Sequence, residues 1–209
     1  MHNEISETNR AAWNKIVKEG RTIHAGKSDK EDGFINLLIK LAPPGGKVLD
    51  LGCGTGLPIG KMLYDAGLKV TGVDVSDEMI RLASKNLPKS TFFRMPMTDI
   101  DFENKFDGVI SSYSLLCLPP EDFNLMADKI NKALKRGGYF LLFLNEGDSK
   151  EGQIQEVQGQ QMYSTGKSEE EIRETFETKG MKIEKIDRET GTTPEYGLEH
   201  EMMFLMRKI

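Results

Sequence analysis

One stretch, residues 47–74, constrains the fold more than any other part of this chain. It reads KVLDLGCGTGLPIGKMLYDAGLKVTGVD. The apolar run Val48–Leu51 stops at three alternating glycines, a helical pattern continues to Ala66, and a second apolar run, Leu68–Val73, stops at Asp74. This order of strand, glycine loop, helix, strand and acid predicts the opening βαβ unit of a sheet that binds nucleotides.

The glycines Gly52, Gly54 and Gly56 let the backbone turn sharply, because a residue without a Cβ adopts a positive φ at little cost. The bare loop also lets a ligand reach the main chain, and it opens onto a helix N-terminus whose free N–H groups attract negative charge. Asp74 ends the adjacent strand, where its carboxylate can accept hydrogen bonds from both hydroxyls of a ribose. These features predict a site for an adenine nucleoside that carries an anionic or dipolar group.

The glycine spacing indicates which kind of nucleoside ligand the loop binds. Dinucleotide-binding chains carry G-x-G-x-x-G, whose third glycine lets the helix pack closely on the strand. Here the third glycine, Gly56, comes one residue early, and no Gly-Lys-Ser/Thr follows to make a phosphate-binding loop. The string DLGCGTG, with an acid closing the next strand, resembles the class I S-adenosylmethionine-dependent methyltransferases, in particular the small-molecule, type 11/25-like group.

The resemblance runs from about Lys47 to the C-terminus and implies the fold of that family. This is an α/β, Rossmann-like fold with a seven-stranded, mostly parallel sheet, an antiparallel last strand and helices on both faces. The chain offers two terminal strands without a helix between them, which requires one antiparallel strand. The later helices are expected over Asp77–Asn86, over Glu121–Lys135 and from Ser168, which has a capping-box partner in Glu171. The later strands are expected over Thr91–Met95, Phe106–Ser112, Tyr139–Leu144, Met181–Ile186 and Glu201–Arg207.

We expect a single domain with additions around a cofactor-binding core at 45–144. Helical patterns over Ile5–Val17 and Phe34–Leu41 flank a polar, loop-like segment at 21–32, and by resemblance residues 1–44 form a helical lid. Residues 145–167 read as a long, polar loop, which by resemblance caps the acceptor. Residues 168–209 supply the last helix and the strand pair.

The resemblance also implies which residues hold the cofactor. Asp99 would accept from the adenine amine, while Met79 would cover the ring, although Met79 and Trp13 have ordinary packing as their alternative. The full expected set is Trp13, Asp50, Gly52, Cys53, Gly54, Gly56, Asp74, Val75, Met79, Thr98, Asp99 and Ser112. For the acceptor we expect Tyr113, Met162 and Tyr163.

The implied function is transfer of a methyl group from S-adenosylmethionine to a small molecule by in-line displacement. Base-methylating enzymes often carry Asn-Pro-Pro-aromatic after the fourth strand, whereas this chain has SSYS at 111–114, which disfavours a nucleic-acid base as acceptor. A general base is needed only if the acceptor must lose a proton. The candidates are His24, Glu146, Tyr163 and His200, and none is assigned. The alternatives are an NAD(P)-dependent oxidoreductase and a non-catalytic S-adenosylmethionine-binding protein.

The length, composition and charge of the chain limit the classes of protein to which it can belong. The 209 residues are 38% hydrophobic, enough for one α/β domain, and the net charge of -5 argues against a dedicated nucleic-acid binder. No apolar run of spanning length and no leader pattern occurs, so we expect a cytoplasmic protein that does not bind membranes, as a monomer or homodimer. Cys53 and Cys117 have no metal-ligand spacing, and we expect neither a metal site nor a disulfide.

Overall fold

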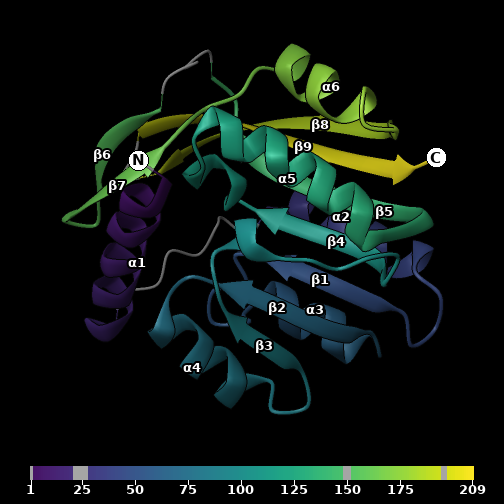
Figure 1. Cartoon of the computed structure of the whole chain (residues 1–209), viewed down its shortest axis with the longest axis horizontal. Coiled ribbons are helices and arrows are strands. Elements are labelled where there is room, and N and C mark those ends of the chain that lie inside the picture. Colours follow the sequence, from purple (N-terminus) through teal and green to yellow (C-terminus); the bar gives the residue numbers. More distant parts are fainter. Residues whose placement is uncertain (1, 21–27, 148–151, 194–196) are drawn as a thin grey trace.

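The computed structural model describes residues 2–20, 28–147, 152–193 and 197–209. Its centre is a seven-stranded sheet in the order β3-β2-β1-β4-β5-β9-β8 (Figure 1). The five strands from β3 to β5 pair in parallel, and β9 runs antiparallel to both β5 and β8, which confirms the predicted fold class. The strands are β1 (Lys47–Leu51), β2 (Lys69–Asp74), β3 (Thr91–Arg94), β4 (Phe106–Ser112), β5 (Leu134–Asn145), β8 (Met181–Thr193) and β9 (Gly197–Lys208).

The described ranges contain six α-helices, which surround this sheet. Helices α2 (Asp29–Leu41) and α3 (Ile59–Asp65) pack on one face, and α5 (Pro120–Ala133) and α6 (Glu169–Glu177) pack on the other. Helix α4 (Asp77–Asn86) lies beside β2 and β3, and α1 (His2–Lys18) crosses one edge of the sheet (Figure 1). None of the helices in the described ranges is both long and apolar enough to cross a membrane.

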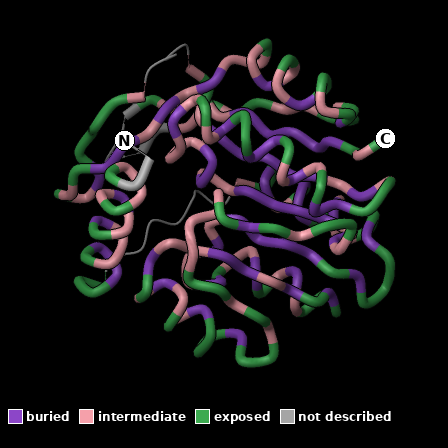
Figure 2. Tube along the Cα trace, in the orientation of Figure 1, coloured by how far each residue is buried: buried purple, intermediate pink, exposed green. Residues whose placement is uncertain are grey.

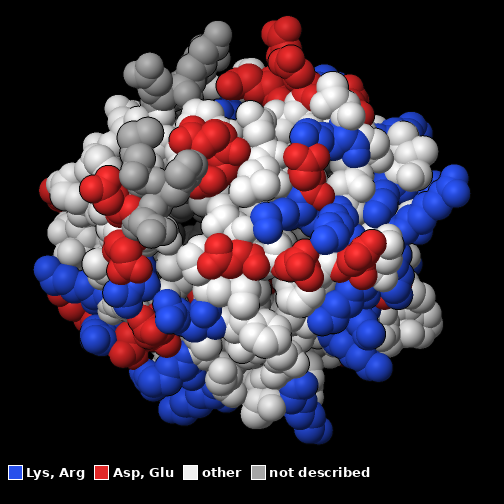
Figure 3. All heavy atoms as spheres, in the orientation of Figure 1, with Lys and Arg blue, Asp and Glu red and all other residues white. Residues whose placement is uncertain are grey.

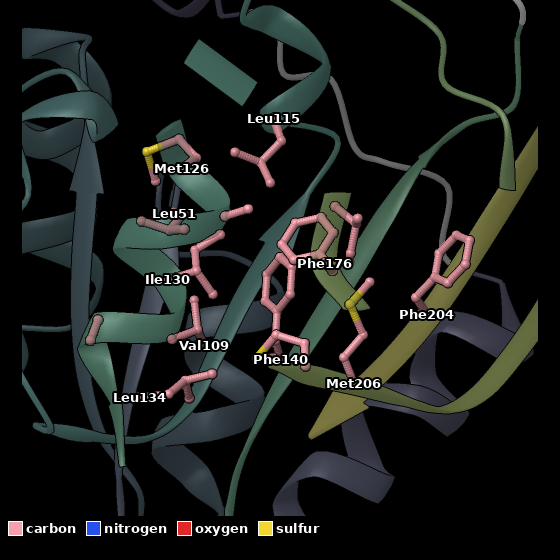
Figure 4. Packing of buried hydrophobic residues seen from close by; sticks show 14 of the residues in the cluster. Leu51, Val109, Leu115, Met126, Ile130, Leu134, Phe140, Phe176, Phe204 and Met206 are labelled. Atoms are coloured by element: carbon pink, nitrogen blue, oxygen red, sulfur yellow. The ribbon is translucent and has the colours of Figure 1, made fainter. Parts of the chain in front are cut away.

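Each face of the sheet carries its own apolar core. In β1, Val48 packs toward α2 and α3, while the next residue, Leu49, packs toward α5. On the α5 and α6 side, the ring of Phe176 lies 5.3 Å from that of Phe140 in β5, and both appear in Figure 4. Because both faces are covered, the central strands are buried along their length (Figure 2), which explains their continuous apolar sequence.

Caps and turns explain most of the element boundaries. The Ser76 and Ser168 hydroxyls accept hydrogen bonds from the N–H groups of Met79 and Glu171, and the second of these belongs to the predicted capping box. Several boundaries were predicted wrongly. Strand β5 begins at Leu134 rather than Tyr139, and β8 and β9 extend to Thr193 and from Gly197 because they pair along this whole length. Helix α5 ends at Ala133, because Leu134 already pairs with Phe106 as the first residue of β5.

Helix α2 also begins earlier than predicted, at Asp29 inside the segment predicted as a loop. The Ser28 hydroxyl accepts from the N–H of Glu31 at 3.1 Å and so caps the helix one turn earlier than the apolar pattern suggested.

The predicted loop at 145–167 is also wrong in part, since it contains a second, two-stranded sheet. Strands β6 (Gln153–Val157) and β7 (Gln160–Ser164) form an antiparallel hairpin. Gln158 and Gly159 connect them with φ angles of 49° and 73°, the left-handed pair that a tight hairpin turn needs. The sequence lacks the usual Asn-Gly signal, so the hairpin was not foreseen.

Candidate functional site

The carboxyl ends of β1, β2 and β4 meet where the strand order of the sheet reverses. Strand β1 pairs with β2 on one side and with β4 on the other, and ligands of open α/β sheets bind at such a reversal. The glycine loop follows β1, Asp74 ends β2, and Ser112 ends β4. The topology thus brings these predicted site residues to one edge.

The glycine loop is fixed by its own backbone. Gly52, Gly54 and Gly56 have φ angles of 69°, 52° and 74°. The N–H groups of Gly52 and Cys53 both donate to the Val73 carbonyl, at 2.8 and 3.0 Å. These bonds tie the loop to the end of β2.

Two of the glycines have different reasons for lacking a side chain. A Cβ on Gly52 would lie 2.3 Å from the Cβ of Ser114, so Gly52 is needed for packing. A Cβ on Gly54 would meet nothing nearer than the sulfur of Met79, at 3.9 Å. The space above Gly54 is therefore open to a ligand, and Met79, itself 7% exposed, borders it.

Asp74 is held by the main chain on both of its carboxylate oxygens. Its Oδ2 accepts from the N–H of Gly54 at 2.9 Å, and its Oδ1 accepts from the N–H of Ser76 at 2.8 Å. Burial raises the pKa of Asp74 to about 6, against the opposing effect of these hydrogen bonds. Each carboxylate oxygen has a second lone pair, so Asp74 can still accept from a ligand.

A second carboxylate, Asp50, lies close to Asp74. Asp50 is 3% exposed, and burial raises its pKa to about 7, with a smaller contribution from the charge of Asp74. The ion pairs found in the described ranges leave both groups without a cationic partner. Two buried carboxylates without a cation are costly, and a positively charged ligand would offset that cost.

This electrostatic arrangement predicts how stability depends on pH. Asp50 titrates at a higher pH in the folded than in the unfolded chain, so the folded state binds more protons between pH 4 and 7. The free energy of unfolding of the ligand-free protein should therefore decrease as pH rises through that range. Asp50→Asn should reduce this decrease, as measured by urea denaturation at a series of pH values. An unchanged pH dependence would show that Asp50 is charged in both states.

Helix α1 covers this edge of the sheet. On one side, the Asn14 amide oxygen accepts from the Ser76 hydroxyl at 2.7 Å, and Arg10 pairs with Asp77 at 2.7 Å, which joins α1 to the start of α4. On the other side, Asn9 bonds to both the N–H and the carbonyl of Tyr163 in β7, at 2.9 and 3.2 Å. Figure 1 shows α1 in this position, between β7 and α4.

Asn9→Ala should therefore weaken the attachment of α1. Asn9 is 4% exposed, and its removal leaves buried main-chain groups without partners, at a cost of about 1–3 kcal/mol in the free energy of unfolding. Chemical denaturation measures this loss. The control is Asn124→Ala, which removes an exposed amide whose partner, Thr175, is 3.4 Å away, and it should change stability far less. Equal effects of the two substitutions would contradict the anchoring role.

The other predicted cofactor residues lie around the same edge. Cys53 is buried beside the loop, and burial raises the pKa of its thiol well above the usual value. The buried hydroxyl of Ser112 has no hydrogen-bond partner in the described ranges. Val75 and Thr98 are half-buried, while Asp99 is exposed in the short helix η1 (Met97–Asp99).

The predicted acceptor residues of the hairpin point in different directions. Met162 and Tyr163 are consecutive in β7, so their side chains project from opposite faces. Met162 is 2% exposed and packs against α1, in a cluster that includes Ile16 and the partly buried Trp13 of that helix. The Tyr163 ring lies beside Gly152, where a Cβ would come within 2.2 Å of it. Only Met162 therefore packs toward the helix that covers the site.

The candidate general bases are mostly engaged elsewhere. Glu146 is exposed and pairs with Arg188 at 3.3 Å. His200 is also exposed, and its Nδ1 lies 3.1 Å from the hydroxyl of Thr190. His24 lies outside the described residues.

Sequence reasoning missed several residues that organise this edge. Asn9 and Asn14 carry no motif. For Glu31 the sequence did contain a signal of burial, because Glu31 lies at helical spacing from the apolar residues Phe34 and Leu38. In the structure it belongs to the buried stripe of α2 and is 5% exposed.

A separate hollow of about 710 Å³ lies at the opposite, amino-terminal edge of the sheet. It is open to solvent and its lining includes Lys47, Lys69, Lys89 and Phe93. It shares no residue with the glycine loop.

Comparison with known proteins gives a family match for part of the chain. Residues 48–138 match the methyltransferase domain family. An uncharacterized methyltransferase of Synechocystis is 35% identical over 100 residues, which are 47% of this chain and 47% of the relative. An uncharacterized methyltransferase of Staphylococcus carnosus is 35% identical over 109 residues, 48% of this chain and 50% of the relative. The matched part thus spans about half of each relative.

Solved structures share the fold over the whole chain. The 1,6-didemethyltoxoflavin-N1-methyltransferase of Burkholderia thailandensis superposes with a TM-score of 0.77 at 21% identity, covering 100% of this chain and 90% of that one. A SAM-dependent methyltransferase of Methanosarcina mazei gives 0.73 at 19% identity, covering 83% and 97%. The [4+2]-cyclase SpnF gives 0.70 at 16% identity, covering 99% and 94%. Residues 48–138 therefore match a methyltransferase domain, and the chain shares its fold with solved structures that include S-adenosylmethionine-dependent methyltransferases.

Proposed function

We propose that this protein is an enzyme that transfers a methyl group from S-adenosylmethionine to a small-molecule acceptor by in-line displacement. The observation that carries the proposal is the hydrogen bond from the N–H of Gly54 to Asp74. It holds an open backbone cradle and a ribose-binding carboxylate side by side at the strand-order reversal.

The residues present fit this cofactor. Asp74 would accept from the ribose hydroxyls, and the loop from Gly52 to Gly56 would face the amino-acid tail. Asp50 and Asp74, buried without a cation, would be compensated by the positive charges of the sulfonium and ammonium groups. The remaining proposed contacts are Trp13, Cys53, Val75, Met79, Thr98, Asp99 and Ser112.

The chain itself would mainly position the reactants. When bound, S-adenosylmethionine supplies a methyl group that is already activated on a cationic sulfur. Helix α1 and the β6–β7 hairpin, joined through Asn9, would exclude water and hold the acceptor in line. This gives residues 1–44 the role of a lid and residues 145–167 the role of a cap, with Tyr113, Met162 and Tyr163 as acceptor contacts.

Two observations support a small molecule as the methyl acceptor. The neighbour from Burkholderia thailandensis is named for a small heterocyclic acceptor. On the face in Figure 3, Lys and Arg side chains lie among Asp and Glu side chains, and the net charge of -5 disfavours a polyanionic acceptor.

A second candidate function is S-adenosylmethionine binding without methyl transfer. SpnF, named as a cyclase, has the same fold, so the fold alone does not fix the reaction. An NAD(P)-dependent oxidoreductase is a third candidate, disfavoured by the early third glycine.

Two measurements separate the candidates. S-adenosylmethionine and S-adenosylhomocysteine should raise the melting temperature, whereas NADH should not. Incubation with methyl-labelled S-adenosylmethionine and a metabolite extract should then yield a labelled product, identified by mass. Stabilisation by NADH alone would favour the oxidoreductase, and cofactor binding with no labelled product would favour the non-catalytic protein.

A further inference from the structure

A cluster of acidic side chains lies under α2, at the carboxyl edge of β4, β5, β9 and β8. Glu201 of β9 stands opposite Asn145 of β5 and Glu189 of β8, so these side chains form a row on one face of the sheet. Glu31 belongs to the first turn of α2, and Tyr113 follows β4. We call Glu31, Tyr113, Glu189 and Glu201 the acidic cluster.

Glu31 is the buried member of the acidic cluster. It is 5% exposed and lies one turn before Phe34, whose ring packs edge-on against Phe143 of β5 at 6.2 Å. Its Oε1 has no hydrogen-bond partner in the described ranges. Burial raises the pKa of Glu31 to about 7 and the charge of Glu201 adds to this, while the nearby Tyr113 hydroxyl and the backbone N–H of Ser28 oppose it.

Tyr113 brings a hydroxyl to the same place through an unusual backbone conformation. Its φ is +51°, a left-handed value that costs a residue with a Cβ roughly 1 kcal/mol. Its N–H donates to the Phe143 carbonyl at 2.9 Å, and its buried hydroxyl faces Glu31 and Glu201 without a hydrogen-bond partner in the described ranges. The structure therefore holds this ring at the cluster despite strain.

Basic side chains near the acidic cluster are engaged elsewhere. Lys30 pairs with Asp187 at 3.1 Å. Arg188 pairs with Glu146 and Glu169, and the ammonium group of Lys185 lies 4.4 Å from the centre of the Phe34 ring. Glu189 also has a buried oxygen without a partner in the described ranges, and Glu199, on the same strand face as Glu201, accepts from Asn145 at 2.8 Å. Among the described residues, the carboxylates of Glu31, Glu189 and Glu201 therefore form no ion pair.

The acidic cluster adjoins the proposed cofactor site. The hydroxyl of Ser114, the residue after Tyr113, donates to the Leu51 carbonyl at 2.6 Å. The same serine fills the space beside Gly52. Tyr113 is therefore the direct sequence neighbour of the residue that packs against the glycine loop.

Building on the proposed function, we propose that the acidic cluster binds the methyl acceptor and that this acceptor is an amine. A protonated amine supplies the positive charge that the carboxylates lack, and its N–H groups match the unpartnered oxygens of Glu31, Tyr113 and Glu189. A carboxylic acid or phosphate would be repelled by the same groups.

The acidic cluster also provides a route for the proton. The ammonium group gives one proton to the Glu31 carboxylate and becomes a neutral amine with a free electron pair. The N–C bond then forms as the S–C bond breaks, and the sulfur keeps the electron pair of that bond. The methylated nitrogen leaves as a cation, and Glu31 releases its proton to solvent.

The first test is the identity of the labelled product in the extract experiment. We expect the label on nitrogen, in a product retained by a cation exchanger. A label on oxygen, sulfur or carbon overturns the inference but leaves the proposed methyltransferase intact. If the cofactor binds and no product forms, amine binding is tested by adding 2-phenylethylamine, putrescine or spermidine in the presence of S-adenosylhomocysteine and measuring the melting temperature. If none of these amines changes the melting temperature, the inference is overturned as well.

The second test uses Glu31→Gln, with exposed Glu103→Gln as the matched control. Glu31→Gln should raise the KM for the amine at least 10-fold and lower kcat, while the Kd for S-adenosylmethionine stays within twofold. It should also raise the melting temperature at pH 8, because it removes a buried charge without a partner. A lower melting temperature would mean that the chain itself compensates Glu31. Glu201→Gln repeats the KM measurement at a more accessible member, and an unchanged KM in both variants overturns the inference.

Discussion

Replacing Gly54 with valine is expected to abolish S-adenosylmethionine binding while the protein stays folded. Gly54 has a φ of +52°, and its missing Cβ leaves a space that only the Met79 sulfur approaches, at 3.9 Å. A branched side chain would fill the cradle that the ligand's tail needs. We expect at least a 100-fold loss of affinity, or about 2.8 kcal/mol, by calorimetry with S-adenosylhomocysteine and S-adenosylmethionine.

The matched control for this experiment is Gly67→Val. Gly67 also has a left-handed backbone, with a φ of +82°, and no atom lies within 4 Å of its Cβ position. It lies between α3 and β2, away from the carboxyl edge. Both variants should lose similar stability through backbone strain, roughly 1–2 kcal/mol, but only Gly54→Val should lose binding. Full binding by Gly54→Val would place the ligand elsewhere.

Asp74→Asn is expected to weaken cofactor binding by about 1–3 kcal/mol, or roughly 5- to 150-fold. Both oxygens of Asp74 accept main-chain hydrogen bonds, from Gly54 and Ser76. An amide has one oxygen, so its NH2 group must face one of these donors. The substitution therefore disturbs the loop and also removes the charge that faces the ribose and the cationic groups.

The charge of Asp74 gives this prediction a pH dependence. The pKa of Asp74 is about 6 in the ligand-free protein, so the group is mostly protonated at pH 5 and mostly charged at pH 8. Affinity for S-adenosylmethionine should therefore be weaker at pH 5, and the difference should shrink in Asp74→Asn. The control Asp65→Asn removes an exposed carboxylate paired with Lys61, and it should bind like the wild type. Equal affinity of Asp74→Asn and wild type would remove Asp74 from the site.

The order and type of the elements could be predicted because local signals and burial agree. Strand β4 and helix α4 have the predicted bounds, Phe106–Ser112 and Asp77–Asn86. In β4 both faces are buried, which produces an apolar run, and in α4 the Ser76 cap marks the start. The antiparallel end of the sheet followed from two strands without an intervening helix.

Other features depend on contacts that no local pattern reveals. The β6–β7 hairpin is polar on much of its surface, and its Met162 becomes buried only because α1 packs on it. Asn9 acts across a sequence separation of 154 residues. The start of β5 at Leu134 depends on pairing with Phe106, so α5 ends earlier than its helical pattern suggests.

The sequence by itself determined the proposed cofactor half of the site, because the glycines, the helix that follows them and the strand-end acid all lie within one short βαβ unit. Only the tertiary structure decided the proposed acceptor half. Glu31, Glu189 and Glu201 come from α2, β8 and β9, Tyr113 comes from the turn after β4, and each is an ordinary residue in its own segment. Their shared burial and uncompensated charge arise when α2 packs on the sheet, and long-range electrostatics of this kind has no counterpart in local sequence.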